Sequence, residues 1–248
     1  MSNMRAFLAY RYNWTAFGLV AAVMCLSVPS CYRATAQPES AQPQQMDIRS
    51  FVHETYIEGM PYDAANAYGS DAVTTLLEML NDPDEAPYRA NIAVALCIIG
   101  DERAVEPVIS LIEEPVAGEL SAQDYRAKAG TVMALGYLVN KSANDQALQY
   151  LLRSVDPDSW SERGIQWKGP FQPTLLERNV DLSSQAILGL ALSGRPEASV
   201  ALSSIPEAKF LGIPAVSEFV QAAQAAHQQV AQDGLSEYYR KSKSGFGN

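Results

Sequence analysis

The sequence has few of the residues that build metal sites, disulfides or nucleic-acid-binding surfaces. It holds two histidines and three cysteines among 248 residues, which leaves little material for a metal centre. Its 28 acidic residues outnumber 18 basic ones, and the net charge of −10 argues against a phosphate-binding surface. Fifteen glycines and 14 prolines are too few for a collagen-like or low-complexity chain. With 48% hydrophobic residues, the composition is that of one or two globular domains.

The sequence also lacks the short motifs of several enzyme classes. It contains no phosphate-binding loop, no Gly-rich dinucleotide fingerprint and no Gly-x-Ser-x-Gly elbow. His53-Glu54 begins like a zinc-protease helix, but Ile57 stands where the second ligand would be. His227 lies alone among glutamines and alanines, and we interpret it as a surface residue. We therefore expect no enzymatic activity, no cofactor and no metal.

The first 36 residues have the features of a secretory signal peptide. They contain three arginines and no acid, and an apolar run of 15 residues extends from Trp14 to Val28. That run is shorter than the roughly 20 residues of a membrane-spanning helix. Small residues at Ala34 and Ala36 predict cleavage before Gln37. We expect an extracytoplasmic protein, periplasmic or secreted, with no membrane span after cleavage.

Two alternatives to cleavage remain open, an uncleaved membrane anchor and a lipid anchor at Cys31. The residues before Cys31 include Pro29, which fits the lipoprotein pattern poorly. Cleavage would leave 15 basic and 28 acidic residues, a net charge of −13, and a single cysteine, Cys97. A single cysteine forms no internal disulfide. Because Cys97 lies in an apolar helical pattern, we expect it to be buried.

Beyond a Gln/Pro/Ser-rich segment at 37–46, which predicts a flexible linker, one apolar spacing recurs from 47 to 240. Four stripes have apolar residues at i, i+3, i+4 and i+7, and each predicts one face of a helix. They begin 32, 43 and 50 residues apart. The stripes are Val73, Leu76, Leu77 and Leu80; Val105, Val108, Ile109 and Ile112; Leu148, Leu151, Leu152 and Val155; and Ala198, Ala201, Leu202 and Ile205.

Each stripe is followed by a proline and preceded by a turn residue. Proline cannot continue a helix, and glycine or asparagine can adopt the left-handed conformation that ends the preceding helix. A second set of apolar stripes predicts the first helix of the later three pairs. For the first pair, the segment Ile48–Tyr56 is the candidate for this helix. The prolines are Pro83, Pro115, Pro157 and Pro206, and the turn residues are Gly69, Gly100, Asn140 and Gly194. The earlier stripes are Ile92, Leu96 and Ile99; Thr131, Leu135 and Leu138; and Leu188, Ala191 and Leu192.

A recurring unit of helix, turn, helix and proline predicts an α-solenoid. Residues 92–109, with Ala95-Leu96, Gly100-Asp101, Arg103-Ala104-Val105 and Glu106-Pro107, resemble a HEAT repeat of the phycobilisome-lyase type. Ala134-Leu135-Gly136 and Ile187-Leu188-Gly189 resemble the same Ala-Leu-Gly step. The chain also resembles uncharacterised exported bacterial HEAT-repeat proteins. The resemblance covers about residues 48–207 and implies a fold rather than an activity.

The expected fold is all-α, a right-handed α-solenoid of about four HEAT-type helix pairs with a C-terminal cap helix. In such repeats, Asp101 and Arg103 form a helix cap and a stacking ion pair. The cap helix has an apolar face followed by Gly234, and residues 241–248 form a loose tail. The apolar face of the cap helix consists of Val216, Phe219, Ala223, Ala226 and Val230.

The segment 158–178 has no helical period and departs from the repeat. It contains both tryptophans of the mature chain, Trp160 and Trp167, close to Arg163, Lys168 and Phe171. Long loops are often functional, and aromatic and arginine residues are typical interface anchors. One hypothesis is a partner-recognition loop. The alternative is that both rings fold back over the core.

The second helix of each pair predicts an acidic band. If these helices line the inner face, as in HEAT proteins, their off-stripe positions include Glu78, Glu106 and Glu113. Such a band favours a protein partner with a basic surface, although plain solvation of the charges is an alternative. We expect an exported, non-catalytic protein-interaction scaffold that does not bind nucleic acid. The resemblance to phycobilisome lyases implies an alternative, an accessory enzyme or chaperone.

Overall fold

A computed structural model describes residues 46–57, 59–116, 118–172, 174–210 and 216–244. In these ranges the chain is helical and contains an isolated β-bridge but no β-strand, which confirms the all-α prediction. The chain divides into two compact units, residues 48–238 and the two terminal segments. The fold described below is that of residues 48–238. The predicted signal peptide, its cleavage site at Ala34, Ala36 and Gln37, Cys31 and the linker up to residue 45 lie outside the described residues.

The described chain forms α-helices joined by short turns and three 3-10 helices (η1–η3). The α-helices are α2 (Ile48–His53), α3 (Tyr62–Asn66), α4 (Ser70–Asn81), α5 (Arg89–Ile99), α6 (Val105–Glu113), α7 (Ala122–Ser142), α8 (Asp145–Ser154), α9 (Pro157–Glu162), α10 (Leu175–Ser193), α11 (Pro196–Ser203), α12 (Val216–Asp233) and α13 (Leu235–Ser244). The 3-10 helices are η1 (Pro83–Tyr88), η2 (Glu102–Ala104) and η3 (Glu207–Lys209).

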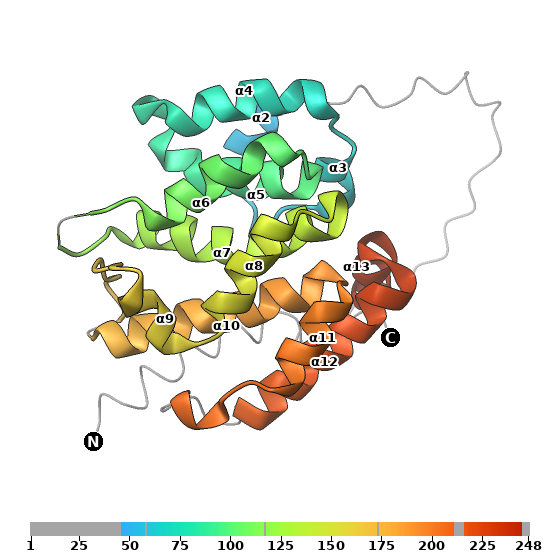
Figure 1. The fold of residues 1–248 in the computed structure, drawn as a ribbon. Helices are drawn as coiled ribbons and strands as arrows, with labels where there is room; N and C mark the ends of the chain where they lie inside the picture. Colours follow the sequence, from blue (N-terminus) through green and yellow to red (C-terminus); the bar gives the residue numbers. More distant parts are fainter. Residues whose placement is uncertain (1–45, 58, 117, 173, 211–215, 245–248) are drawn as a thin grey trace, which may run out of the picture. The chain divides into compact units, whose positions relative to one another are not determined.

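The helices pack in chain order. Helix α5 packs on α4 and α7, α7 packs on α5 and α10, and α10 packs on α7 and α12. Figure 1 shows this succession from α4 at the top to α12 at the bottom. Helices α8 and α11 both pack on α10. Helices α5, α7 and α10 therefore pack mainly on one another, although α6, α8 and α9 lie between them in the sequence.

The predicted stripes form the core. In the second helices, Val73, Leu76, Val108, Leu148, Leu151, Ala198 and Leu202 are at most 1% exposed. In the first helices, Ile92, Leu96, Leu135 and Leu138 are fully buried. Cys97 is also fully buried, as predicted. The period identified most of the interior, but the i+4 residue of each second-helix stripe is only half-buried: Leu77, Ile109, Leu152 and Ala201. Val155 and Leu188 are half-buried as well.

Two of the four predicted turn residues are confirmed and two are wrong. Gly100 (φ 76°) and Gly194 (φ 64°) adopt the left-handed conformation and end α5 and α10. Gly69 has a φ of −89° and precedes α4 in extended backbone. Asn140 lies inside α7, which continues to Ser142, and Ala143 takes the left-handed position instead. The Asn140 amide donates to the Ser193 carbonyl of α10 at 3.1 Å.

The repeated Asp-Pro-Asp sequence starts a short helix in both places. Asp82 accepts a hydrogen bond from the backbone N–H of Asp84 and caps η1. Asp156 does the same with Asp158 and caps α9. In both cases the proline occupies the first turn of the helix, where it loses no intrahelical bond. The prolines after the first and third stripes therefore begin short helices, besides ending α4 and α8.

Helices α7 and α10 touch through two glycines. A Cβ atom on Gly136 would overlap the carbonyl oxygen of Gly189, and one on Gly189 would lie within 3.1 Å of the Met133 carbonyl oxygen. These glycines are those of the two predicted Ala-Leu-Gly steps. The step recurs because two backbones meet there without room for a side chain.

The C-terminal helices differ from prediction in two respects. The buried face of α12 consists of Val220, Ala223, His227 and Val230, so the interpretation of His227 as a surface residue is wrong: it is 5% exposed. Gly234 ends α12 with a φ of 79°, as predicted. However, α13 extends to Ser244, so residues 241–244 are helical rather than part of a loose tail.

Candidate functional site

Two irregular segments of the chain contact each other. The loop before α7 pairs with the segment between α9 and α10 through a parallel bridge of Glu119 with Lys168, in which the Leu120 N–H donates to the Lys168 carbonyl at 2.7 Å. The second segment is shorter than predicted, because α9 ends at Glu162 and α10 begins at Leu175. We call residues 163–172, together with α9, the insertion.

Trp160 anchors the insertion in the interior. Its side chain is fully buried. The indole N–H donates to the Ser154 carbonyl at 3.1 Å and to the Ser183 hydroxyl at 3.0 Å. The ring edge contacts Tyr150, with 6.4 Å between the ring centroids. The indole therefore joins α8 to α10 and is not available to a partner.

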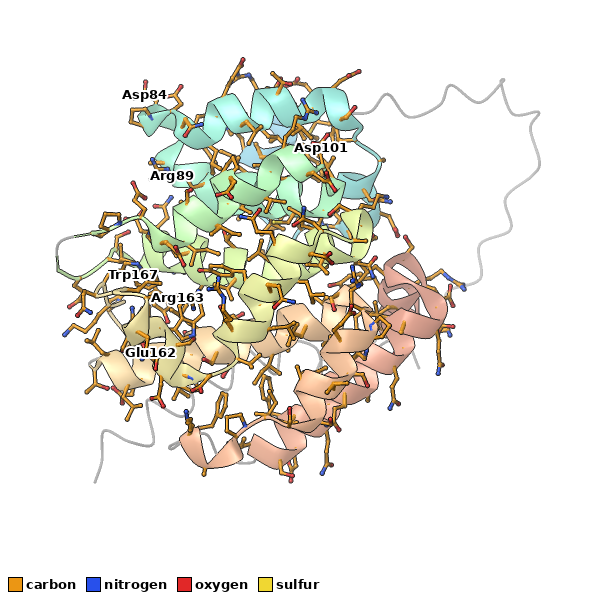
Figure 2. The ribbon with its side chains drawn as sticks, viewed as in Figure 1. Asp84, Arg89, Asp101, Glu162, Arg163 and Trp167 are labelled. Atoms are coloured by element: carbon orange, nitrogen blue, oxygen red, sulfur yellow. The ribbon has the colours of Figure 1, made fainter. Side chains whose placement is uncertain are left out.

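Arg163 covers this aromatic pair. Its guanidinium lies 4.2 Å from the Trp160 ring centroid and 4.7 Å from that of Tyr150, distances typical of cation–π contacts. It also donates to the Glu113 carboxylate at 3.3 Å and to the Ser154 hydroxyl at 3.1 Å. Figure 2 labels Arg163 and Trp167 at this end of the molecule. Arg163 thus connects the insertion to α6 and α8.

Trp167 is buried between two cations. Its ring is 1% exposed and lies 5.5 Å from the Lys128 ammonium and 5.2 Å from the Arg178 guanidinium. The edge of the ring meets Tyr125 at 6.0 Å between centroids. Its surroundings come from α7 and α10, which makes Trp167 a core residue of the insertion.

Lys128 and Arg178 are buried cations that bind backbone carbonyls. The Lys128 amine donates to the carbonyls of Leu111 at 2.5 Å and Glu114 at 3.2 Å, which is the expected role of a cation at the C-terminus of a helix such as α6. The Arg178 guanidinium donates to the carbonyls of Trp167 at 3.0 Å and Ile165 at 2.9 Å. Both residues are at most 2% exposed.

Burial changes the proton affinity of both cations. It lowers the pKa of Lys128, while the Glu114 carboxylate 3.6 Å away favours the charged form. It lowers the pKa of Arg178 to about 10, which still leaves the guanidinium charged at neutral pH. Neither role was predicted from the sequence. The sequence does contain one sign of the role of Lys128: it is a charged residue on a face of α7 that otherwise consists of small and apolar residues.

Trp160 and Trp167 are both buried, which agrees with the alternative in which the rings fold back over the core; partner binding by the segment stays a prediction. Arg163 is engaged by the tryptophan and Glu113. Lys168 is half-buried, and its carbonyl binds the loop before α7. Phe171, at 37% exposed, is the most accessible aromatic residue of the insertion. The physical reason is that the irregular backbone needs a covering of rings and donors to be buried.

The predicted acidic band is exposed. Glu78 on α4 and Glu106 and Glu113 on α6 all face solvent. Glu106 accepts a hydrogen bond from Gln146 of α8, and Glu113 pairs with Arg163. Asp101 and Arg103 form the expected cap and ion pair: Asp101 accepts from the Arg103 N–H at 2.9 Å, and the Arg103 side chain lowers the pKa of Asp101.

The described residues offer little reactive chemistry. Within them, no group of three or more His, Cys, Asp or Glu side chains is placed to hold a metal ion. Burial raises the pKa of the Cys97 thiol, which keeps it as an unreactive thiol. Cavities of about 180 Å³ and 160 Å³ are smaller than the roughly 300–1,000 Å³ typical of ligand pockets.

Comparisons with protein-family models, curated proteins and solved structures gave no match to this chain. In the described ranges, each helix is too short or too polar to cross a membrane.

Proposed function

We propose that the protein is an exported, non-catalytic scaffold of HEAT-type repeats that binds another protein with a basic surface. The proposal includes a right-handed solenoid arrangement and cleavage of residues 1–36. The observation that carries the proposal is a row formed by the second helices α4, α6, α8 and α11. Hydrogen bonds connect the beginning of each helix in this row to the beginning of the next. The helices of the row also present exposed carboxylates.

A similar contact occurs between each pair of neighbours in this row. The Arg103 side chain, just before α6, donates to the Ser70 carbonyl of α4 at 2.8 Å. Gln146 of α8 donates to Glu106 of α6. Arg195, just before α11, donates to the Ala143 carbonyl before α8 at 2.9 Å. Two of these contacts join an arginine to a backbone carbonyl and the middle one joins two side chains, but all three link the starts of successive helices. Links between successive units are what a stack of repeats requires, and they support the repeat interpretation.

The charge of the row supports a basic partner. Exposed acids on its helices and at their starts outnumber the exposed arginines, Arg103 and Arg153. Ion pairs occur on both sides of this balance: Arg103 pairs with Asp101, Arg163 with Glu113, and Arg195 with Asp145 and Glu197. The carboxylates still outnumber the arginines when all of these residues are counted. A surface of one sign raises the association rate of an oppositely charged partner and makes binding sensitive to salt. The exposed acids are Asp71, Glu78, Glu102, Glu106, Glu113, Asp145 and Glu197.

A matched pair of charge reversals tests the row. The double variant Glu78→Lys/Glu106→Lys changes the row, whereas Glu162→Lys/Glu218→Lys makes the same change in net charge on α9 and α12. Binding of a Lys/Arg-rich peptide is measured by titration at low and at physiological salt. We expect the first variant to weaken binding several-fold more than the second. If both variants weakened peptide binding equally, binding would depend on the net charge of the protein and not on this row of helices.

The export part of the proposal is tested separately. N-terminal sequencing and intact mass of the exported protein should give a chain that begins at Gln37. A chain that begins at a lipid-modified Cys31, or one that retains Met1, would contradict cleavage before Gln37 and leave the binding experiment unaffected.

A further inference from the structure

The cavity of about 160 Å³ lies between the start of α5, the end of α6, the loop that follows α6 and the first turns of α7. One part of its lining is charged and the other part is apolar. The charged part consists of Arg89, Glu114, Asp124 and Lys128. The apolar part consists of Leu111, Val116, Leu120 and Ala127, each of which keeps some accessible area.

Arg89 offers hydrogen-bond donors that the described residues do not use. Its guanidinium makes no hydrogen bond with them, and the Glu114 carboxylate, 3.9 Å from Nη1, is beyond hydrogen-bonding distance. The side chain, labelled in Figure 2, is 24% exposed, while Nε is enclosed. A ligand therefore meets the edge formed by Nη1 and Nη2, which a carboxylate fits with two parallel hydrogen bonds.

Two of the other charges already balance each other. The Lys128 amine donates to the carbonyls of Leu111 and Glu114, and the Glu114 carboxylate lies 3.6 Å from it. The Lys128 side chain is only 3% exposed. We therefore assign it no contact with a ligand and treat it as the counterion of Glu114.

Asp124 supplies the negative charge that faces Arg89 across the same cavity. The residue is half-buried. Its Oδ2 accepts the Ser121 hydroxyl at 2.7 Å, which leaves Oδ1 to accept from a ligand. The start of α7 is joined to the segment before Arg89, because the Gln123 amide donates to the Pro87 carbonyl at 2.5 Å.

The charges of the lining restrict the kind of ligand. Two cations and two carboxylates sum to zero, so a simple anion or cation would leave one charge of the cavity without a counterpart. An apolar ligand would remove water from Arg89 without replacing its hydrogen bonds, which is unfavourable. A small molecule that carries both an anionic and a cationic group satisfies both sides of the cavity.

We propose that this cavity binds a small free α-amino acid, of the size of alanine to valine. The α-carboxylate accepts from Arg89, the α-ammonium donates to Asp124, and the aliphatic side chain contacts Val116 and Leu120. At about 30 Å³ for each water molecule, the cavity has room for about five waters, which limits the ligand to a short side chain. This inference does not depend on the proposed scaffold function.

Nuclear magnetic resonance of the protein tests the ligand class. The backbone amide signals of Leu120 and Ala127 are followed while L-alanine or L-valine is added. N-acetyl-L-alanine lacks the ammonium and L-alaninamide lacks the carboxylate, and we expect each to bind about ten- to a hundredfold more weakly than alanine, the effect of one charged hydrogen-bonding group. Unchanged signals with tens of millimolar amino acid, or equal affinity for all compounds, would overturn the proposal.

Two arginines give a matched pair of variants. Arg89→Gln removes the proposed carboxylate partner, whereas Arg126→Gln makes the same charge change at an exposed residue of α7 that does not line the cavity. We expect Arg89→Gln to weaken alanine binding about ten- to a hundredfold and Arg126→Gln to leave it unchanged. Equal effects of the two variants would overturn the proposal.

A second readout separates binding from stability. Without its carboxylate partner, Arg89→Gln should bind alanine and alaninamide equally, a change that a purely structural role of Arg89 would not produce. Arg89→Lys keeps the charge but loses the paired donors, and it should bind alanine several-fold more weakly. Melting temperatures confirm that the variants are folded. If folded Arg89→Gln still preferred alanine over alaninamide as the unchanged protein does, the assignment of Arg89 would be wrong.

Discussion

The α5–α6 pair and the insertion between α8 and α10 are buried to a similar degree by different side chains. In the first region, Ile92, Leu96, Val108 and Ile112 are fully buried aliphatic residues at helical spacing. In the second region, the interior consists of Trp160 and Trp167, packed beside the buried cation Arg178 of α10. The difference lies in the backbone that has to be covered.

A helix satisfies its own carbonyls, so aliphatic side chains suffice to bury it. The insertion has carbonyls without helical partners, and Arg178 supplies donors to two of them. Lys128 does the same at the end of α6. The aromatic rings then shield these bonds from water. The insertion is therefore a built part of the core and not a loop laid over it.

The largest expected effect is in the insertion. Trp167→Ala removes a fully buried indole and should lower the free energy of unfolding by about 3–5 kcal/mol. Chemical denaturation followed by circular dichroism measures the loss. A loss near 0.5 kcal/mol or less, the level of surface substitutions, would contradict a core role for the ring.

A slightly smaller effect is expected in the regular pair. Leu96→Ala should cost about 2–5 kcal/mol, the range for truncation of a buried leucine, with a single cooperative transition because neighbouring helices share interfaces. Comparison with Trp167→Ala sharpens the contrast between the regions. If the Leu96→Ala variant lost its helical circular dichroism signal in two separate transitions, the two regions would not belong to one cooperative unit.

The contact between α7 and α10 predicts a third, smaller loss. Gly136→Ala forces a methyl group against the Gly189 carbonyl and should cost about 1–3 kcal/mol. Gly130→Ala is the control, because Gly130 lies in the same helix and an added methyl group there would meet no atom within 4 Å. That change should be neutral or stabilise by about 0.5–1 kcal/mol. Equal melting temperatures for the two variants would refute the close contact.

The smallest expected effect is on the pH dependence of stability. Burial lowers the pKa of His227 below its ordinary value near 6.5, so the folded state favours the neutral ring. The free energy of unfolding should therefore fall as the pH drops below about 6.5 towards the pKa of His227 in the folded state. Above about pH 6.5, His227 should not change the pH dependence of stability. Thermal unfolding of His227→Gln should lack this component. His53→Gln, which changes the other histidine, should retain it.

The parts of the fold that sequence could predict rest on local rules. Gly100 and Gly194 end helices because left-handed backbone favours glycine, and Leu96 is buried because the helical period places it on the inner face. The rest depends on partners distant in sequence. Asn140 stays helical because its amide reaches Ser193, and Trp160 is buried because Ser183 accepts its N–H. No local pattern contains these pairings.

The pairing of Gly136 with Gly189 limits how α7 and α10 can move. The two backbones touch where neither helix carries a side chain. A sliding motion would bring the Cβ atoms of adjacent residues onto the opposite backbone, whereas a rotation about the contact point would not. The contact therefore holds the register of the two longest helices of residues 48–238. Hydrogen bonds from Asn140 to Ser193 and from Tyr125 to Asp181, on either side of the contact, oppose a change in the angle between the helices.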